Sequence, residues 1–130
     1  MTSISKTASL LLWAGLYISI CFPGMSLASE EDNMTYLKID FSVQEKHLTE
    51  FMGIMRGLNS AMASEKGFVN ASVFVDEDDA TKITLIEAWT SRKVHMEHYD
   101  HIVADGTWAG VLLMLNDEPE MSYNRAVAVE

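Results

Sequence analysis

The sequence predicts an α+β domain built from two β-α-β halves that share one four-stranded antiparallel sheet. Short segments in which hydrophobic and polar residues alternate predict strands with one buried face. Two longer segments carry hydrophobic residues at helical spacing, and each of them follows a strand. The resulting order, β-α-β-β-α-β, is typical of the ferredoxin-like sandwich, in which both helices lie on the same face of the sheet.

The first 28 of the 130 residues differ from the rest of the chain. They carry one charge, Lys6, followed by 13 mostly apolar residues at 8–20. That stretch is shorter than the roughly 20 residues of a membrane-spanning helix but suits the core of a secretory signal. Small residues at Ser26 and Ala28 predict cleavage after Ala28. We therefore expect residues 1–28 to be a signal peptide and the protein to be exported, periplasmic or secreted, with no stable membrane insertion afterwards.

Cys21 leaves a second interpretation open, namely a lipoprotein whose cysteine is acylated. Ile20 precedes it, where lipoprotein signals resemble one another in having a small residue, so we favour removal of Cys21 with the signal. An uncleaved N-terminal anchor is the other alternative. Cleavage would leave the exported domain without any cysteine, and therefore without disulfides or a thiol nucleophile.

The charge of the chain excludes one class of partner. It has 9 Lys and Arg against 19 Asp and Glu, a net charge of −10, and loss of Lys6 makes this 8 − 19 = −11. A strongly anionic surface repels phosphate backbones at long range. We expect no nucleic-acid partner.

The elements of the domain follow an acidic lead-in, residues 29–34, and occupy residues 35–130. A strand is predicted over 36–43, where an S-x-x-E capping box at Ser42 and Glu45 starts a helix that stops near Lys66-Gly67. The residues at 68–75 and 82–89 form a hairpin. A second helix begins at Thr90-Ser91 and is interrupted at Asp105-Gly106. The remaining expected elements are a short, largely buried helical segment at 107–115 and a fourth strand at 121–129.

The motif E-x-W-x-S at Glu87-Ala88-Trp89-Thr90-Ser91, with a histidine nine residues after the tryptophan at His98, resembles the antibiotic biosynthesis monooxygenase (ABM) family. The segment from Ala61 to Gly67 and the V-x-x-D at 73–76 add weaker points of similarity. The resemblance covers residues 34–129. It implies a homodimeric α+β barrel in which each subunit has a cavity between sheet and helices, and a second subunit would cover the apolar residues on the sheet's other face.

Several members of this family oxidise phenols, anthrones or quinols with molecular oxygen and no prosthetic group, whereas others isomerise small metabolites or degrade haem. The sequence has no G-x-G-x-x-G after a strand and no phosphate loop, which fits the branch without a cofactor. Haem degradation is disfavoured. Members of the haem-degrading branch resemble one another in an asparagine on the first strand, a tryptophan in the second helix and a histidine ten residues later, whereas strand 36–43 offers Asp40 and the other two residue types are exchanged at His98 and Trp108.

The resemblance and the residue pattern single out two candidate catalytic residues. His98 lies on the predicted inner stripe of its helix, where a neutral imidazole can accept a phenolic proton; the alternative is a hydrogen-bonded core histidine. Glu87 is a carboxylate among apolar neighbours and needs a partner, for which Arg125, Tyr123 or a histidine of the second helix are candidates. Structural pairing and proton transfer remain open for Glu87.

The other candidates are aromatic and polar side chains that can surround a ligand. Trp89 is expected either in the core or in the cavity wall. The remaining predicted substrate-binding residues are Trp108, Asn70, Tyr99, Tyr123 and Arg125. His95, His98 and His101 are spread over about 120° of helix surface, since three residues advance a helix by −60°, so we expect no metal site.

The sequence therefore predicts a cofactor-independent monooxygenase acting on a small aromatic or quinol-like molecule. Two alternatives remain open: a non-catalytic module that binds a small ligand in the same cavity, and an isomerase of a small metabolite.

Overall fold

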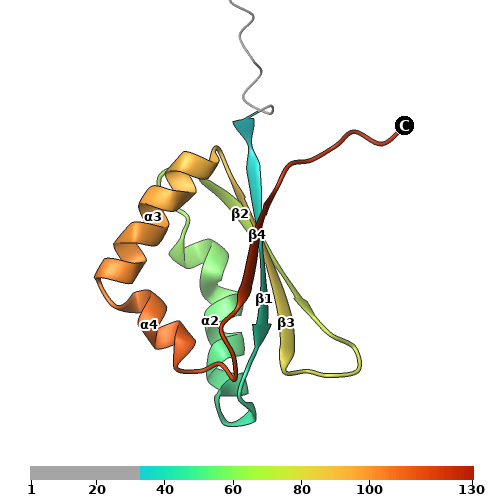
Figure 1. Cartoon of the computed structure of the whole chain (residues 1–130), viewed down its shortest axis with the longest axis vertical. Helices are drawn as coiled ribbons and strands as arrows, with labels where there is room; N and C mark the ends of the chain where they lie inside the picture. The colour runs from blue at the N-terminus through green and yellow to red at the C-terminus, as the bar shows by residue number, and fades with distance from the viewer. Residues whose placement is uncertain (1–32) are drawn as a thin grey trace, which may run out of the picture.

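The structure is a computed structural model that describes residues 33–130 and contains one four-stranded antiparallel sheet with every helix on the same face (Figure 1). The sheet order is β2-β3-β1-β4. The strands are β1 (Thr35–Ser42), β2 (Phe68–Val75), β3 (Lys82–Trp89) and β4 (Glu120–Asn124). The predicted ferredoxin-like α+β fold is confirmed.

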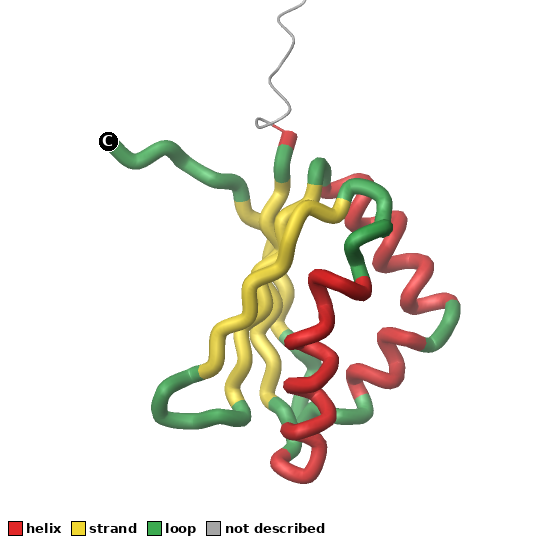
Figure 2. The backbone as a smooth tube through the Cα atoms, turned by 180° about the vertical axis from the view of Figure 1, so that it is seen from behind, coloured by secondary structure: helices red, strands yellow, loops and turns green. Residues whose placement is uncertain are grey.

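Three α-helices and one turn of 3-10 helix cover that face of the sheet, and the view from behind shows the opposite face without any helix (Figures 1 and 2). These elements are η1 (Glu45–His47), α2 (Leu48–Ala61), α3 (Arg92–Ala104) and α4 (Thr107–Leu112). No helix of residues 33–130 is long and apolar enough to cross a membrane. The predicted signal peptide and most of the acidic lead-in lie outside the described residues.

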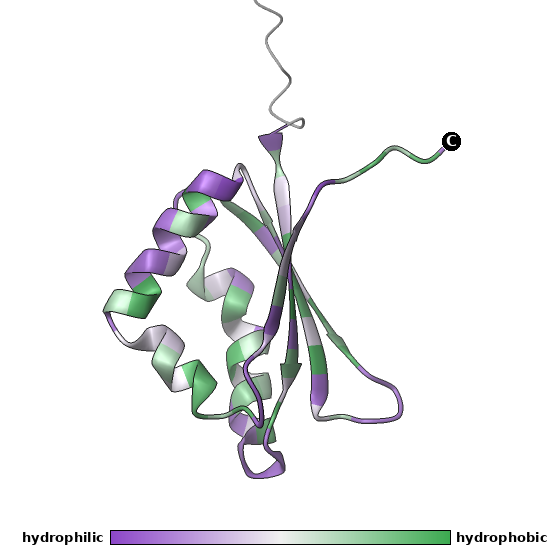
Figure 3. Ribbon diagram, in the orientation of Figure 1, coloured by the Kyte–Doolittle hydropathy of each residue, from purple (hydrophilic) through white to green (hydrophobic). Residues whose placement is uncertain are grey.

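The core forms because alternate strand residues point toward the helices. In β1, Leu37, Ile39 and Phe41 are buried on this side, whereas Lys38 lies on the opposite face. The strand ribbons accordingly change between hydrophobic and hydrophilic bands in Figure 3. Helix α2 adds Phe51 and Met55 to the same core.

The start of the first helix differs from the prediction. Gln44 is the residue that precedes η1, and no side chain caps it, so Ser42 and Glu45 do not form a capping box. Ser42 instead ends β1, and its hydroxyl accepts a hydrogen bond from Asn116.

The end of this helix is also earlier than predicted, because α2 stops at Ala61 and a turn leads to Gly67. Gly67 has φ +77°, and its carbonyl accepts a hydrogen bond of 2.8 Å from the Thr90 backbone N–H. A Cβ at this position would clash with the side chains of Val94 and Thr90. Gly67 therefore allows the turn that follows α2 to lie against the start of α3.

The second half of the domain follows the prediction more closely. Ser91 caps α3, where its hydroxyl accepts a hydrogen bond of 3.2 Å from the Val94 N–H. Asp105 ends α3, and Gly106, with φ +87°, separates it from α4. Helix α4 is shorter and more exposed than expected, because it ends at Leu112 and has no fully buried residue.

The fourth strand is five residues long instead of nine. It ends at Asn124, which lies opposite Tyr36, and β1 itself begins only one residue earlier. Residues 125–130 therefore have no neighbouring strand to pair with and lead away from the body of the domain (Figure 1).

Candidate active site

A cavity of about 150 Å³ lies between the helices and the covered face of the sheet. Both the α2 side and the α3–α4 side contribute to its wall, and most of the lining is hydrophobic. The aliphatic and sulfur-containing lining residues are Ile39, Ile54, Met55, Leu58, Met62, Leu85, Ile102, Val111 and Met121. The aromatic and polar ones are Phe41, Glu87, His95, His98, Tyr99, Thr107 and Trp108.

Glu87 is the buried carboxylate of this cavity. It lies on the covered face of β3 and is only 7% exposed. The Trp89 indole N–H donates a hydrogen bond of 2.9 Å to its Oε2 atom, and this is the one hydrogen bond that the Glu87 side chain makes within residues 33–130. Burial raises the pKa of the Glu87 carboxyl, although the hydrogen bond from Trp89 opposes this effect.

His95 lies beside Glu87 and is 3% exposed. Its Nδ1 atom is 2.7 Å from the Tyr123 hydroxyl, and its Nε2 atom is 4.0 Å from Glu87 Oε2. Burial lowers the pKa of the His95 imidazole to about 4, so the ring is neutral at pH 7. A neutral imidazole keeps one nitrogen as an acceptor, which is what proton transfer from a ligand requires.

Tyr123 links His95 to the surface. Its ring lies under the Arg92 guanidinium, whose central carbon is 4.2 Å from the ring centroid. Burial raises the pKa of the Tyr123 hydroxyl, and the positive charge of Arg92 partly offsets the increase.

His98 is the second histidine of the cavity. Its ring lies beside Trp89, with the centroids 5.1 Å apart, and its Nδ1 atom is 3.3 Å from a carboxylate oxygen of Glu65. These two groups do not form a hydrogen bond. The Glu65 carboxylate still favours a proton on Nδ1, which leaves Nε2 available as an acceptor.

The structure brings together six of the eight predicted site residues. His98, Glu87, Tyr99 and Trp108 line the cavity directly. Trp89 is fully buried and supports Glu87. Tyr123, one of the expected partners of Glu87, instead contacts His95.

The two other predicted substrate-binding residues lie away from this cavity. Asn70 is exposed on β2, opposite Ala88 on the bare face of the sheet. Arg125 follows the end of β4 and lines a shallow hollow on the bare face with Tyr36 and Lys38. Their role in binding remains a prediction that the cavity does not support.

The sequence prediction did not assign His95 to the site, because it placed the inner stripe of the second helix on Val94, His98 and Ile102. In the structure the side of α3 that lines the cavity carries His95, His98, Tyr99 and Ile102. These positions follow the i, i+3, i+4, i+7 spacing of a buried helix face. That spacing was the available signal for including His95.

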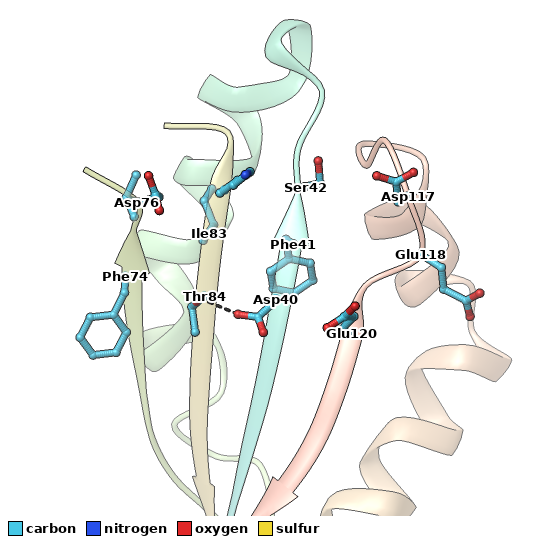
Figure 4. A pocket seen from close by; sticks show the side chains of 12 residues that line it. Asp40, Phe41, Ser42, Phe74, Asp76, Ile83, Thr84, Asp117, Glu118 and Glu120 are labelled. Carbon is cyan, nitrogen blue, oxygen red and sulfur yellow. Dashed lines mark hydrogen bonds between the residues drawn. The ribbon is translucent and has the colours of Figure 1, made fainter. Parts of the chain in front are cut away.

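A second hollow, of about 600 Å³, lies at the end of the sheet near the β2–β3 hairpin and the start of β4 (Figure 4). Its lining includes one cation, Lys82, and five carboxylates, those of Asp40, Asp76, Asp117, Glu118 and Glu120. Within residues 33–130, no three His, Cys, Asp or Glu side chains are arranged to hold a metal ion. The cavity between the helices and the sheet is the better candidate, because it combines an apolar wall with the buried titratable groups Glu87 and His95.

This combination defines a ferredoxin-like domain with a cavity between its sheet and its helices. The sequence model of the family described as antibiotic biosynthesis monooxygenase matches residues 34–101. The chain belongs to the ABM family. A search of curated proteins found no match.

Solved structures support the same fold. A conserved protein from Methanosarcina mazei Go1 superposes with a TM-score of 0.64 at 17% identity, covering 74% of this chain and 95% of the other. SnoaB, a cofactor-independent oxygenase from Streptomyces nogalater, superposes with a TM-score of 0.63 at 14% identity, covering 75% of this chain and 96% of the other. Rv0793 from Mycobacterium tuberculosis gives 0.63 at 13% identity, with coverage of 75% and 98%. At these identities the likeness shows the fold alone.

Proposed function

We propose that this protein oxidises a small, phenol- or quinol-like molecule with molecular oxygen and without a bound cofactor. The observation that carries the proposal is the presence of a buried carboxylate, Glu87, and two histidines, His95 and His98, in an otherwise apolar cavity. Membership of the ABM family supports a monooxygenase-type reaction. The cavity volume of about 150 Å³ favours a compact substrate.

His98 is the proposed base. Removal of a hydroxyl proton by its Nε2 atom would produce an electron-rich phenolate, which reacts with oxygen far more readily than the phenol. The Glu65 carboxylate lies 3.3 Å from His98 Nδ1 and favours the tautomer that carries its proton on Nδ1. A phenol can supply all the electrons: it loses its hydroxyl hydrogen and one ring hydrogen, gains one oxygen atom as a carbonyl, and releases the other oxygen as water.

The apolar wall contributes by keeping water away from the reacting ring. Tyr99 and Trp108, whose ring centroids are 5.7 Å apart, form an aromatic corner of this wall. Aromatic side chains favour edge-to-face contact with a planar ligand.

We also propose that the protein acts as an exported homodimer. The bare face of the sheet carries Phe74, which is 56% exposed, and the partly buried Ile86. A second subunit would bury these apolar side chains. Export rests on the predicted signal peptide at residues 1–28.

Oxygen consumption tests the proposed function. The purified protein is mixed with a panel of phenols and hydroquinones under air and under nitrogen, and oxygen uptake and product are followed. We expect uptake with at least one compound and a loss of about 100-fold in turnover for His98→Gln, the usual scale for a general base. An absence of uptake across the panel, with ligand recovered unchanged, would favour the non-catalytic binding module instead.

A further inference from the structure

We infer that Glu87 and His95 act as a pair that recognises one hydroxyl group, and that the ligand is an uncharged hydroxyarene with a single ring. This inference rests on the proposed function, since it names the substrate class of the same cavity. It concerns binding, and a binding experiment can test it separately from the reaction with oxygen.

The distance between the two groups is the first argument. Glu87 Oε2 and His95 Nε2 are 4.0 Å apart, which is too far for a direct hydrogen bond. A hydroxyl oxygen placed beside both atoms can donate to one and accept from the other, because a hydroxyl has both capacities. The gap therefore matches a hydroxyl group of the ligand.

Unused bonding capacity is the second argument. The side chains of His95 and Glu87 are 3% and 10% exposed, and both line the cavity. Glu87 receives one hydrogen bond, from Trp89, and His95 contacts Tyr123 through Nδ1 only. Within residues 33–130, His98 Nδ1 is the one fully buried side-chain nitrogen or oxygen without a partner, so the remaining bonding capacity of Glu87 and His95 is open to the cavity, where a ligand hydroxyl can bond to both.

The supports of the pair make it rigid. Trp89 donates a hydrogen bond to Glu87 Oε2, Tyr123 contacts His95 Nδ1, and the ring of Tyr99 stacks on His95 at an interplanar angle of 27°. A pre-positioned pair binds a hydroxyl without the cost of ordering its side chains. Such a site also discriminates strongly against an analogue that lacks the hydroxyl.

Charge and size limit the rest of the ligand. The lining includes no Lys or Arg among residues 33–130, and Glu87 and the nearby Glu65 are the acidic groups. An anionic ligand would be desolvated there without a cationic partner, which is strongly unfavourable. An apolar cavity of about 150 Å³ is large enough for a benzene-sized molecule. A quinol held by Glu87 and His95 would leave its second hydroxyl for His98.

The test compares ligands that share a shape. Purified protein is titrated under nitrogen with 4-methylphenol, toluene, 4-methylbenzoate and the three-ring 9-phenanthrol, and the Trp89 indole N–H signal is followed by NMR. We expect 4-methylphenol to bind at least about tenfold more tightly than toluene and than 4-methylbenzoate. 9-Phenanthrol is expected not to compete. Equal affinities for 4-methylphenol and toluene, or tight binding of the benzoate or the phenanthrol, would overturn the inference.

Variants of Glu87 locate the effect. Glu87→Leu should reduce the preference for 4-methylphenol over toluene to about twofold or less, whereas Glu87→Gln, which retains hydrogen-bonding capacity, should keep most of it. Toluene binding in each variant reports an intact cavity. His101→Gln is the matched control, because His101 is an exposed histidine on the same helix. If Glu87→Leu does not fold, the comparison of ligands on the unmodified protein still decides the question.

These results separate two kinds of failure. Selective binding of 4-methylphenol without oxygen uptake would contradict the oxygenase proposal and retain the hydroxyl-recognising pair. Oxygen uptake without any preference for 4-methylphenol over toluene would support the oxygenase proposal and contradict the hydroxyl-recognising pair.

Discussion

The two faces of the sheet are built from the same strands but provide different chemistry. Along β3, Leu85 and Glu87 point to the helices, whereas Thr84 and Ile86 point to the bare face. The covered face has a cavity of about 150 Å³, and burial there raises the pKa of Glu87 and lowers the pKa of His95. The bare face has a hollow of about 600 Å³ whose carboxylates remain close to water. Burial, rather than the size of a hollow, marks the candidate site.

Two phenylalanines give the largest expected contrast between the faces. Phe51 is fully buried and contacts Phe41 edge to face, with the centroids 5.1 Å apart, whereas Phe74 is 56% exposed. Phe51→Ala should lower the free energy of unfolding by about 4 kcal/mol, because it leaves a cavity in the core. Phe74→Ala should cost less than about 1 kcal/mol in a dilute monomer. Urea unfolding measures both, and similar costs would show that the bare face is covered.

Acid pH should lower the stability of the protein through His95, which is buried on the covered face. Its folded pKa of about 4 lies below the ordinary value of 6.5, so the unfolded chain binds the proton more readily. The contribution of His95 to the free energy of unfolding is complete above pH 6.5 and is lost as the pH falls toward 4. Its upper limit is about 3 kcal/mol.

The measurement for this prediction is urea unfolding between pH 4 and pH 7 for the natural protein and for His95→Gln. Glu87 acts with the opposite sign, because its raised pKa favours the folded state at low pH, and it is therefore kept in both proteins. The variant should lose less stability on acidification. Parallel curves for the two proteins would show that His95 is not buried as a neutral ring.

Two glycines on the helix side of the sheet test how tightly the helices are packed. Gly67→Ala should cost about 2 kcal/mol, because a positive φ and a clash with Val94 and Thr90 both oppose a side chain. Gly53→Ala, in an open part of α2, should instead stabilise the protein by up to about 1 kcal/mol. Thermal unfolding of both variants is the check, and a neutral Gly67→Ala would mean that the start of α3 can move away.

The smallest contrast concerns hydrogen bonds. Asn59 of α2 makes two bonds to the backbone of Ala71 in β2, of 2.9 and 2.7 Å, and Asn59→Ala should cost about 1 kcal/mol. On the bare face, Thr84 donates a bond of 2.6 Å to Asp40, which is partly exposed. Thr84→Val should change the stability by less than about 0.5 kcal/mol. Equal effects on the unfolding midpoint would contradict this difference between the faces.

Much of the fold followed from local sequence, and the failures had non-local causes. Strand β1 was predictable because the alternation of hydrophobic and polar residues coincides with the alternation of burial along its whole length, whereas β3 was recognised as an apolar segment whose last three residues are all buried. The strand expected at 121–129 was too long, since the alternation continues beyond Asn124 but the neighbouring strand β1 does not. The extent of a strand depends on its partner, which periodicity within one segment does not reveal.

The same reasoning explains the site. Glu87 and His98 were predicted from residue type and family resemblance, and the structure places both in the cavity. His95 was missed because the sequence prediction placed Val94 on the inner face of the helix. The structure shows that His95, the next residue, occupies this face. The contact between His95 and Tyr123 joins residues 28 positions apart, and no local pattern encodes it.

The bonds from Asn59 have a consequence beyond stability. Strand β2 is an edge of the sheet, and an edge strand normally offers free N–H and C=O groups to any other extended chain. Asn59 occupies both backbone groups of Ala71 as a neighbouring strand would. Strand-to-strand aggregation is therefore obstructed at the middle of this edge, and a change of one side chain on a helix would expose it.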